Sequence, residues 1–335
     1  MTHVPDPESP SYRPIYTGDQ LAAYVACIAP DPTYTLATLQ SEIKADPLGA
    51  LSRLQIRQMG FNSWGNVALH YSWHRIITLD SEALFHKIVE RKLGGYCMEN
   101  NAFFATILRS LGYQLYVSGA RISFAVDGNG KHPEGFAGWS HEAILVTIDG
   151  QKYLVDVGFG SQSAIHPIPL VKGDSQNPPK VYNSVPGAEV RLVYRPIASN
   201  TDSSQSLWVL ETRNKTHPEW QGAYCFSEVE WLPADFEIIN YRTSQDPRSW
   251  FTHRLVMVKT LIDEETRTKP VGTLILSGNV IERRLGEAKK EVVLEARTER
   301  ERIIGLRTWF GIVLQPEEER GIVGMASEIR SPPGV

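Results

Sequence analysis

A thiol stands at the predicted start of a helix, because Cys97 follows the pair Gly94-Gly95 and precedes a run of helical periodicity that ends at Gly112. The thiolate is the reactive form of cysteine, and the N–H groups at a helix N-terminus stabilise it. We therefore expect the pKa of the Cys97 thiol to fall toward or below neutral, which would make this residue a nucleophile. The alternative is a buried cysteine that packs as a small apolar side chain.

A β-hairpin is predicted further along the chain, around the Asp-Gly dipeptide at 149–150. This dipeptide favours a two-residue type I′ turn, which would pair Ile148 with Gln151. Continued along both strands, that register places His141 and Asp156 on one face as diagonal neighbours, with Cβ atoms roughly 7–8 Å apart. His and Asp side chains can close that distance with a hydrogen bond, so the turn alone predicts the pair.

A cysteine, a histidine and an aspartate together would supply a nucleophile, a general base and a carboxylate that orients the base. The hairpin register does not place Cys97 beside the other two residues. It also leaves open that His141 is a plain strand residue and that Asp156 only caps a loop.

Three motifs occur in order along the chain: Gly-Gly-Tyr-Cys at 94–97, a strand histidine at 141, and Val-Asp-Val-Gly-Phe-Gly at 155–160. On these motifs the chain resembles the arylamine N-acetyltransferases, and the resemblance extends from about residue 12 to about residue 312. It is strong only at the motifs. One departure is Leu93, which stands where the family has an arginine before the two glycines.

The resemblance implies an acyltransferase in which Cys97, His141 and Asp156 are catalytic. Cys97 would take an acyl group from acyl-coenzyme A and pass it to an aromatic amine or hydrazine, as in xenobiotic detoxification. Acyl-coenzyme A would be a co-substrate, with no tightly bound cofactor and no metal. The resemblance also assigns residues to the substrate and coenzyme A sites: Gly138, Trp139, Phe159, Gly160 and Phe251. A simple loop glycine at 138 and ordinary packing at 159 are the alternatives.

The identity of the acyl donor varies within this family, where malonyl- or propionyl-coenzyme A replaces acetyl-coenzyme A in some members. A malonyl carboxylate buried beside Cys97 would need a cationic partner, because an unpaired buried charge is costly. Leu93 offers none, and the sequence does not show where Arg91 and Lys92 point. We therefore predict acetyl-coenzyme A as the donor. Faster malonyl transfer would imply a cation that the sequence does not reveal.

Two other classes of function remain open. A thiol hydrolase or transglutaminase-like enzyme would use the same three residues on an amide, so that a glutamine side chain rather than acyl-coenzyme A would acylate Cys97. A binding protein of the same fold would keep the motifs without catalysis. In that protein Cys97 would not react preferentially with iodoacetamide.

Composition limits the partners. The 335 residues, 42% hydrophobic and 21% charged, are enough for a large core. A net charge of −4 and the lack of a basic tract argue against nucleic acid, and three scattered cysteines suggest neither a disulfide framework nor a zinc site. Without a signal-peptide pattern or a membrane-length apolar run, we expect a cytoplasmic protein that binds small molecules. No oligomeric state is indicated.

The order of predicted elements indicates an α+β fold with a papain-like or transglutaminase-like triad core, as the resemblance implies. Helices are expected at 20–28 and 35–44, and strands at 251–261, 272–276 and 280–284, followed by a helix capped by Thr298. We expect four parts in order: an N-terminal helical bundle at 1–112 that carries the nucleophile, a β-barrel at 113–216 that carries His141 and Asp156, a connecting segment at 217–250, and a C-terminal α/β lid at 251–335.

Overall fold

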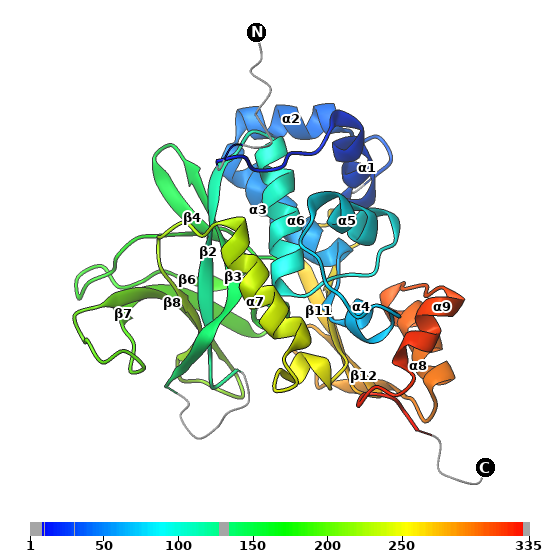
Figure 1. Cartoon of the computed structure of the whole chain (residues 1–335). Helices are drawn as coiled ribbons and strands as arrows, with labels where there is room; N and C mark the ends of the chain where they lie inside the picture. The colour runs from blue at the N-terminus through cyan, green and yellow to red at the C-terminus, as the bar shows by residue number, and fades with distance from the viewer. Residues whose placement is uncertain (1–8, 10, 30, 127–133, 331–335) are drawn as a thin grey trace.

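The computed structural model describes residues 9, 11–29, 31–126 and 134–330. Residues 1–7, on which the expectation about a signal peptide rests, lie outside these ranges. The fold is α+β, as predicted: helices gather around α6, and two antiparallel sheets extend away from them (Figure 1). In the described ranges, no helix is both long and apolar enough to cross a lipid bilayer.

The N-terminal helices begin at polar caps. Thr17 and Thr35 cap the helices predicted at 20–28 and 35–44, and Asp46 caps the next helix, which opens with Pro47. The helical elements before the first long strand are α1 (Gly18–Ile28), α2 (Leu36–Ala45), α3 (Pro47–Phe61), α4 (Val67–His70), α5 (Ser81–Phe85), the π-helical turn η1 (His86–Glu90) and α6 (Cys97–Ser110).

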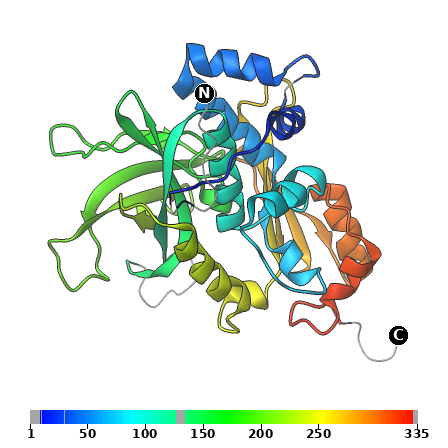
Figure 2. The same ribbon diagram turned by 45° about the horizontal axis from the view of Figure 1, so that its top comes forward.

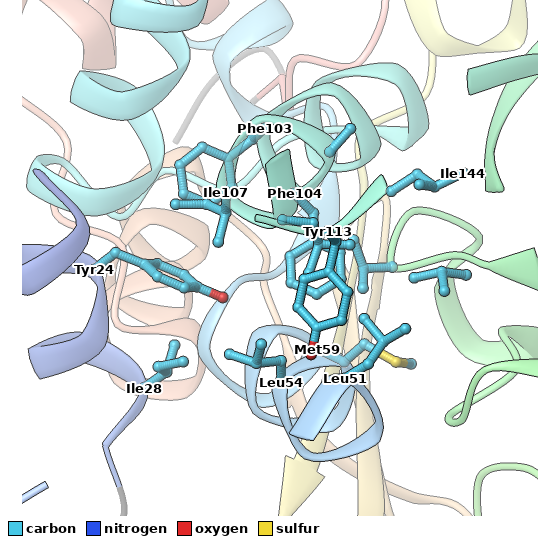
Figure 3. Packing of buried hydrophobic residues seen from close by; sticks show 14 of the residues in the cluster. Tyr24, Ile28, Leu51, Leu54, Met59, Phe103, Phe104, Ile107, Tyr113 and Ile144 are labelled. Atoms are coloured by element: carbon cyan, nitrogen blue, oxygen red, sulfur yellow. The ribbon is translucent and has the colours of Figure 1, made fainter. Parts of the chain in front are cut away.

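Helix α6 is the centre of the largest core cluster. Its residues Phe103, Phe104 and Ile107 are fully buried, and they lie in one cluster with Tyr24 of α1 and Leu54 of α3 (Figure 3). Aromatic side chains of this kind bury large apolar areas, so they hold the helix firmly in place. The first residue of this well-packed helix is Cys97.

An open sheet of order β5-β4-β3-β2-β9-β8-β7-β6 packs beside the helices. The predicted barrel is not closed, because no described residues pair β5 with β6. The sheet also runs past the predicted boundary at 216, since the aromatic-rich segment that follows contains β9. Its strands are β2 (Gln114–Ser123), β3 (Phe136–Ile148), β4 (Gln151–Val155), β5 (Ile168–Pro169), β6 (Val181–Asn183), β7 (Ala188–Pro196), β8 (Ser206–Asn214) and β9 (Gln221–Phe226).

The predicted hairpin is confirmed in strands β3 and β4. Ile148 pairs with Gln151, and both turn residues, Asp149 and Gly150, have the positive φ that a type I′ turn requires. On the other side of β3 the register slips by one residue, since His141 pairs with Ala120 while Trp139 pairs with Arg121. The extra residue between them forms a bulge that re-aims the neighbouring side chains.

A second antiparallel sheet, of order β1-β10-β11-β12-β13, combines distant parts of the chain. Strand β10 begins five residues later than predicted, because Phe251 lies in a 3₁₀ turn closed by a bond from the His253 N–H to the Trp250 carbonyl oxygen, 3.3 Å long. The strands are β1 (Trp64–Gly65), β10 (Val256–Ile262), β11 (Pro270–Ser277), β12 (Val280–Leu285) and β13 (Glu291–Glu295).

The segment predicted as a connection also contains a helix, α7 (Pro233–Gln245), which lies beside α6 and β3 (Figures 1 and 2). The Thr298 cap is confirmed at the start of α8. The division into four parts stays a prediction. The remaining elements are η2 (Gly160–Gln162), η3 (Trp250–Thr252), α8 (Glu299–Gly305), η4 (Leu306–Phe310), α9 (Pro316–Glu319) and η5 (Arg320–Ile322).

Candidate active site

The turn before α6 presents Cys97 from a fixed backbone. Gly94 has φ +71°, and a Cβ there would lie 2.5 Å from the Ser63 carbonyl oxygen, so only glycine fits. Gly95 accepts a hydrogen bond from the Gly65 N–H at 2.9 Å. The Cys97 side chain is buried, and its Sγ lies 3.7 Å from the carbonyl oxygen of Ser140, the bulge residue.

His141 and Asp156 form a fully buried pair, with Nε2 of the histidine 2.7 Å from Oδ2 of the aspartate. Burial alone would raise the pKa of Asp156, but the charge of His141 and the hydrogen bonds it receives outweigh burial and hold that pKa below its ordinary value. The carboxylate therefore only accepts, and Nε2 carries the proton. In the neutral imidazole Nδ1 is then the basic nitrogen, and no described residue forms a hydrogen bond with it.

Asn101, one turn after Cys97 on α6, ties the helix to this pair. Its side-chain N–H group donates to Oδ1 of Asp156 at 2.9 Å and to the Glu142 carbonyl oxygen at 2.6 Å. Its carbonyl oxygen accepts from the Val157 N–H at 2.9 Å. The Cys-x-x-x-Asn spacing is visible in the sequence, but its meaning depends on where β3 and β4 lie.

The environment of the thiol corrects one expectation. Burial raises the pKa of the Cys97 thiol above its ordinary value, and the negative charge of Asp156 raises it further, while the Met98 N–H at the helix start acts in the opposite direction. Desolvation thus outweighs the stabilisation that the helix N-terminus gives to the thiolate. Proton transfer to an adjacent base is then required to form the thiolate.

A cavity of about 410 Å³ opens onto Cys97 and His141. It also receives Phe159 and Phe251, two of the residues assigned by resemblance. Asp156 lies behind His141 and does not line the cavity. The other side chains lining it come from several elements: Trp64, Ile122, Val126, Trp250, Arg254, Val256, Ile275 and Ser277.

Three other residues assigned by resemblance do not line this cavity. Gly138 is exposed, and a Cβ there would meet nothing within 4 Å. Trp139 contacts Arg121, whose Cζ lies 4.3 Å from its ring centre, and Trp231, whose ring centre is 5.2 Å away. Gly160 is buried with φ +75°, a conformation that serves the turn into η2. Their roles in binding remain predictions.

The sequence profile described as N-acetyltransferase matches residues 47–319, well over half of the chain. The chain belongs to the arylamine N-acetyltransferase family. Its members are acyltransferases, so the protein is an enzyme of that class. In the described part of the chain, no group of three or more His, Cys, Asp or Glu residues could hold a metal ion.

Two relatives match most of this chain. N-malonyltransferase FDB2 of Fusarium pseudograminearum is 38% identical over 269 residues, which cover 77% of this chain and 76% of that protein. N-malonyltransferase FDB2 of Gibberella moniliformis is 33% identical over 348 residues, which cover 96% and 95%. The solved structure of Mycobacterium marinum arylamine N-acetyltransferase in complex with CoA superposes with a TM-score of 0.67 at 24% identity, over 90% of this chain and 98% of that one. It establishes the family fold.

Gly158 lies so close to the nucleophile that any side chain would displace it. A Cβ there would lie 2.6 Å from the carbonyl oxygen and 2.9 Å from the Cα of Cys97, both backbone atoms. We expect Gly158→Ala to lower kcat by about a hundredfold, because ångström displacements in an active site cost about that much. Steady-state kinetics checks this, with Gly18→Ala, where a Cβ meets nothing within 4 Å, as the control. Equal kinetics for both variants would contradict the contact.

Glu142 makes stability depend on pH. Its side chain is buried and its Oε2 has no partner among the described residues, and burial raises its pKa well above the ordinary 4.5. Below pH 4.5, the ordinary pKa that applies in the unfolded chain, Glu142 is protonated in both the folded and the unfolded protein. As pH rises the unfolded chain ionises first, so stability falls until the folded pKa is reached.

We therefore expect Glu142→Gln to lose less stability than wild type between pH 5 and pH 8, because the amide cannot ionise. Urea unfolding at both pH values measures the difference. Glu237→Gln, at an exposed carboxylate on α7, should follow wild type. A Glu142→Gln variant with the wild-type pH dependence would show that Glu142 is charged in the folded protein.

Proposed function

We propose that the protein transfers an acyl group from coenzyme A to an aromatic amine through Cys97, and that malonyl-coenzyme A is its donor. The observation that carries the proposal is that the buried Cys97 thiol and the basic nitrogen of the His141–Asp156 pair belong to one cavity. The donor is supported by the two relatives named N-malonyltransferase, in place of the acetyl-coenzyme A expected from the sequence.

In the first half-reaction, His141 Nδ1 takes the thiol proton and Cys97 Sγ attacks the thioester carbonyl carbon. The carbon–sulfur bond to coenzyme A then breaks, and His141 returns the proton to the departing thiolate. The backbone N–H of Cys97 would donate to the oxyanion. Asp156 holds the imidazole with Nδ1 toward the thiol and stabilises the imidazolium that forms.

In the second half-reaction, an aromatic amine attacks the acyl-cysteine carbonyl while His141 accepts a proton from nitrogen. The carbon–sulfur bond breaks, the amide leaves, and the Cys97 thiol is restored. Aromatic walls support an aromatic acceptor, since Phe251 stacks on Trp250 with ring centres 4.0 Å apart and Phe159 stands edge-on to His141 at 5.2 Å.

Intact-protein mass spectrometry without acceptor tests the proposal. After incubation with malonyl-coenzyme A we expect a malonyl adduct that peptide mapping locates on Cys97, with acetyl-coenzyme A reacting more slowly. Failure of every acyl-coenzyme A to modify Cys97 would overturn the acyltransfer mechanism. Modification by a glutamine amide donor instead would favour the transglutaminase-like alternative.

A further inference from the structure

Arg254 brings a permanent charge into the cavity that contains Cys97. The other described side chains lining it are uncharged at neutral pH or, for His141, already committed to Asp156. The Arg254 guanidinium is exposed and donates to Oγ of Ser277 at 3.1 Å. No carboxylate of the described residues forms an ion pair with it, so the guanidinium keeps N–H donors that a bound anion could use.

The backbone holds this arginine in place. Its carbonyl oxygen accepts a hydrogen bond from the side-chain N–H group of Asn66 at 2.8 Å, and its backbone N–H donates to the carbonyl oxygen of Trp250 at 2.9 Å. Ser277 ends strand β11 and pairs directly with Val256 of β10. The guanidinium therefore comes from the loop two residues before β10, and the hydroxyl from the end of the adjacent strand β11. A hydroxyl that accepts one hydrogen bond keeps its own hydrogen as a donor.

We propose that Arg254 and Ser277 form a carboxylate-binding subsite that selects donors with a carboxylate on the acyl group, such as the malonyl group. This inference rests on the proposed acyltransfer function. In a malonyl thioester the carboxylate stands two bonds from the reacting carbonyl carbon, so a carbonyl placed at Cys97 puts the carboxylate inside the same cavity. A guanidinium offers paired N–H donors in the geometry that carboxylates accept.

Arg91 and Lys92, the two cations considered from the sequence, are not placed to bind a carboxylate beside Cys97. Arg91 forms an ion pair with Glu318 at 2.9 Å, and Lys92 lines a separate cavity beside Asp263. Neither lines the cavity of Cys97. Without Arg254, a malonyl carboxylate among Ile122, Ile275 and the aromatic rings would be desolvated and unpaired, which is costly.

The decisive measurement is the rate of Cys97 acylation by each donor in the absence of acceptor, followed by rapid-quench mass spectrometry. Malonyl-coenzyme A is compared with acetyl-coenzyme A and with acetoacetyl-coenzyme A, in which a neutral methyl ketone replaces the carboxylate. Arg254→Met keeps the length of the side chain but removes the charge, Arg254→Lys keeps the charge, and Ser277→Ala removes the hydroxyl. Arg248→Met, at an exposed arginine outside the cavity, is the matched control.

For Arg254→Met we expect malonyl transfer to Cys97 to fall about tenfold, because the exposed guanidinium is partly screened by water and its ion pair contributes less than a buried one. Acetyl and acetoacetyl transfer should stay within about threefold of wild type, as at other exposed positions. Arg254→Lys should restore part of the malonyl rate, and Ser277→Ala should lose a smaller part. The control should match wild type with all three donors.

An equal loss for all donors would show that Arg254 binds the phosphates of coenzyme A, and an unchanged malonyl rate would show that it binds no carboxylate. Either result overturns the subsite. Both leave the acyltransfer mechanism intact, because that fails only if wild-type Cys97 takes up no acyl group. Circular dichroism of each variant confirms folding, and Ser277→Ala gives a second test if Arg254→Met does not fold.

Discussion

Replacing Cys97 with alanine is expected to abolish acyl transfer, with kcat falling on the order of 10⁶-fold, as when the nucleophile of a catalytic triad is removed. Both half-reactions form or break a bond to Sγ, and no other described side chain in the cavity carries a nucleophile of this kind. Stability should fall by only about 1 kcal/mol, because one buried atom is lost. Release of free coenzyme A in the presence of an arylamine measures turnover.

The other cysteines supply the controls for this experiment. Cys27 and Cys225 lie outside the cavity, so Cys27→Ala and Cys225→Ala should retain activity. Substantial turnover by a well-folded Cys97→Ala protein would rule out the covalent mechanism. It would point instead to direct attack of the amine on the thioester.

Asp156→Asn is expected to keep the fold and lose about 10⁴-fold in kcat, the scale of the corresponding change in a Ser-His-Asp triad. Oδ1 of Asp156 accepts from Asn101 and from the Gly158 N–H, at 2.9 and 2.7 Å, and the amide oxygen of asparagine takes over this role. The amide N–H group then faces His141 Nε2, which must accept. The proton moves to Nδ1, and the base is lost.

The rate of Cys97 alkylation by iodoacetamide from pH 6 to pH 9 reports this change directly. The variant should react more slowly than wild type throughout, because its imidazole cannot take the thiol proton. A folded Asp156→Asn protein with the wild-type alkylation profile would show that Asp156 is not coupled to the thiol. The triad proposal would then fail at its third member.

Local rules predicted the pair of His141 and Asp156, because one two-residue turn determines the register of β3 and β4. The start of α6 was also predictable from local sequence, because Gly94 and Gly95 precede the helix and its apolar periodicity ends at Gly112. Asn101 carried a weaker signal, since its spacing from Cys97 is helical but its partners lie on a sheet. These features depend on neighbours in sequence, where turn and helix geometry are well defined.

The rest of the site depends on contacts that no local pattern encodes. Trp64 and Arg254 reach the cavity only because β1 joins β10, almost two hundred residues later. The direction of the Cys97 pKa was mispredicted because burial arises from the whole fold, whereas the helix N-terminus is local. Strand β9 was missed since its aromatic residues lie in a segment that reads as irregular.

The pairing of Trp64 and Gly65 with β10 has a consequence for synthesis on the ribosome. The nucleophile and its hairpin emerge with the first half of the polypeptide, whereas Phe251, Arg254 and Ser277 emerge much later. Until then β1 lacks its antiparallel partner β10. The turn before α6, whose Gly95 accepts a hydrogen bond from Gly65 of β1, therefore contacts a strand that is not yet paired on its other side. Contacts so distant along the chain form slowly. The nascent chain therefore carries its thiol well before the cavity around it is complete, and we expect it to become active only after β10 and β11 have been synthesised.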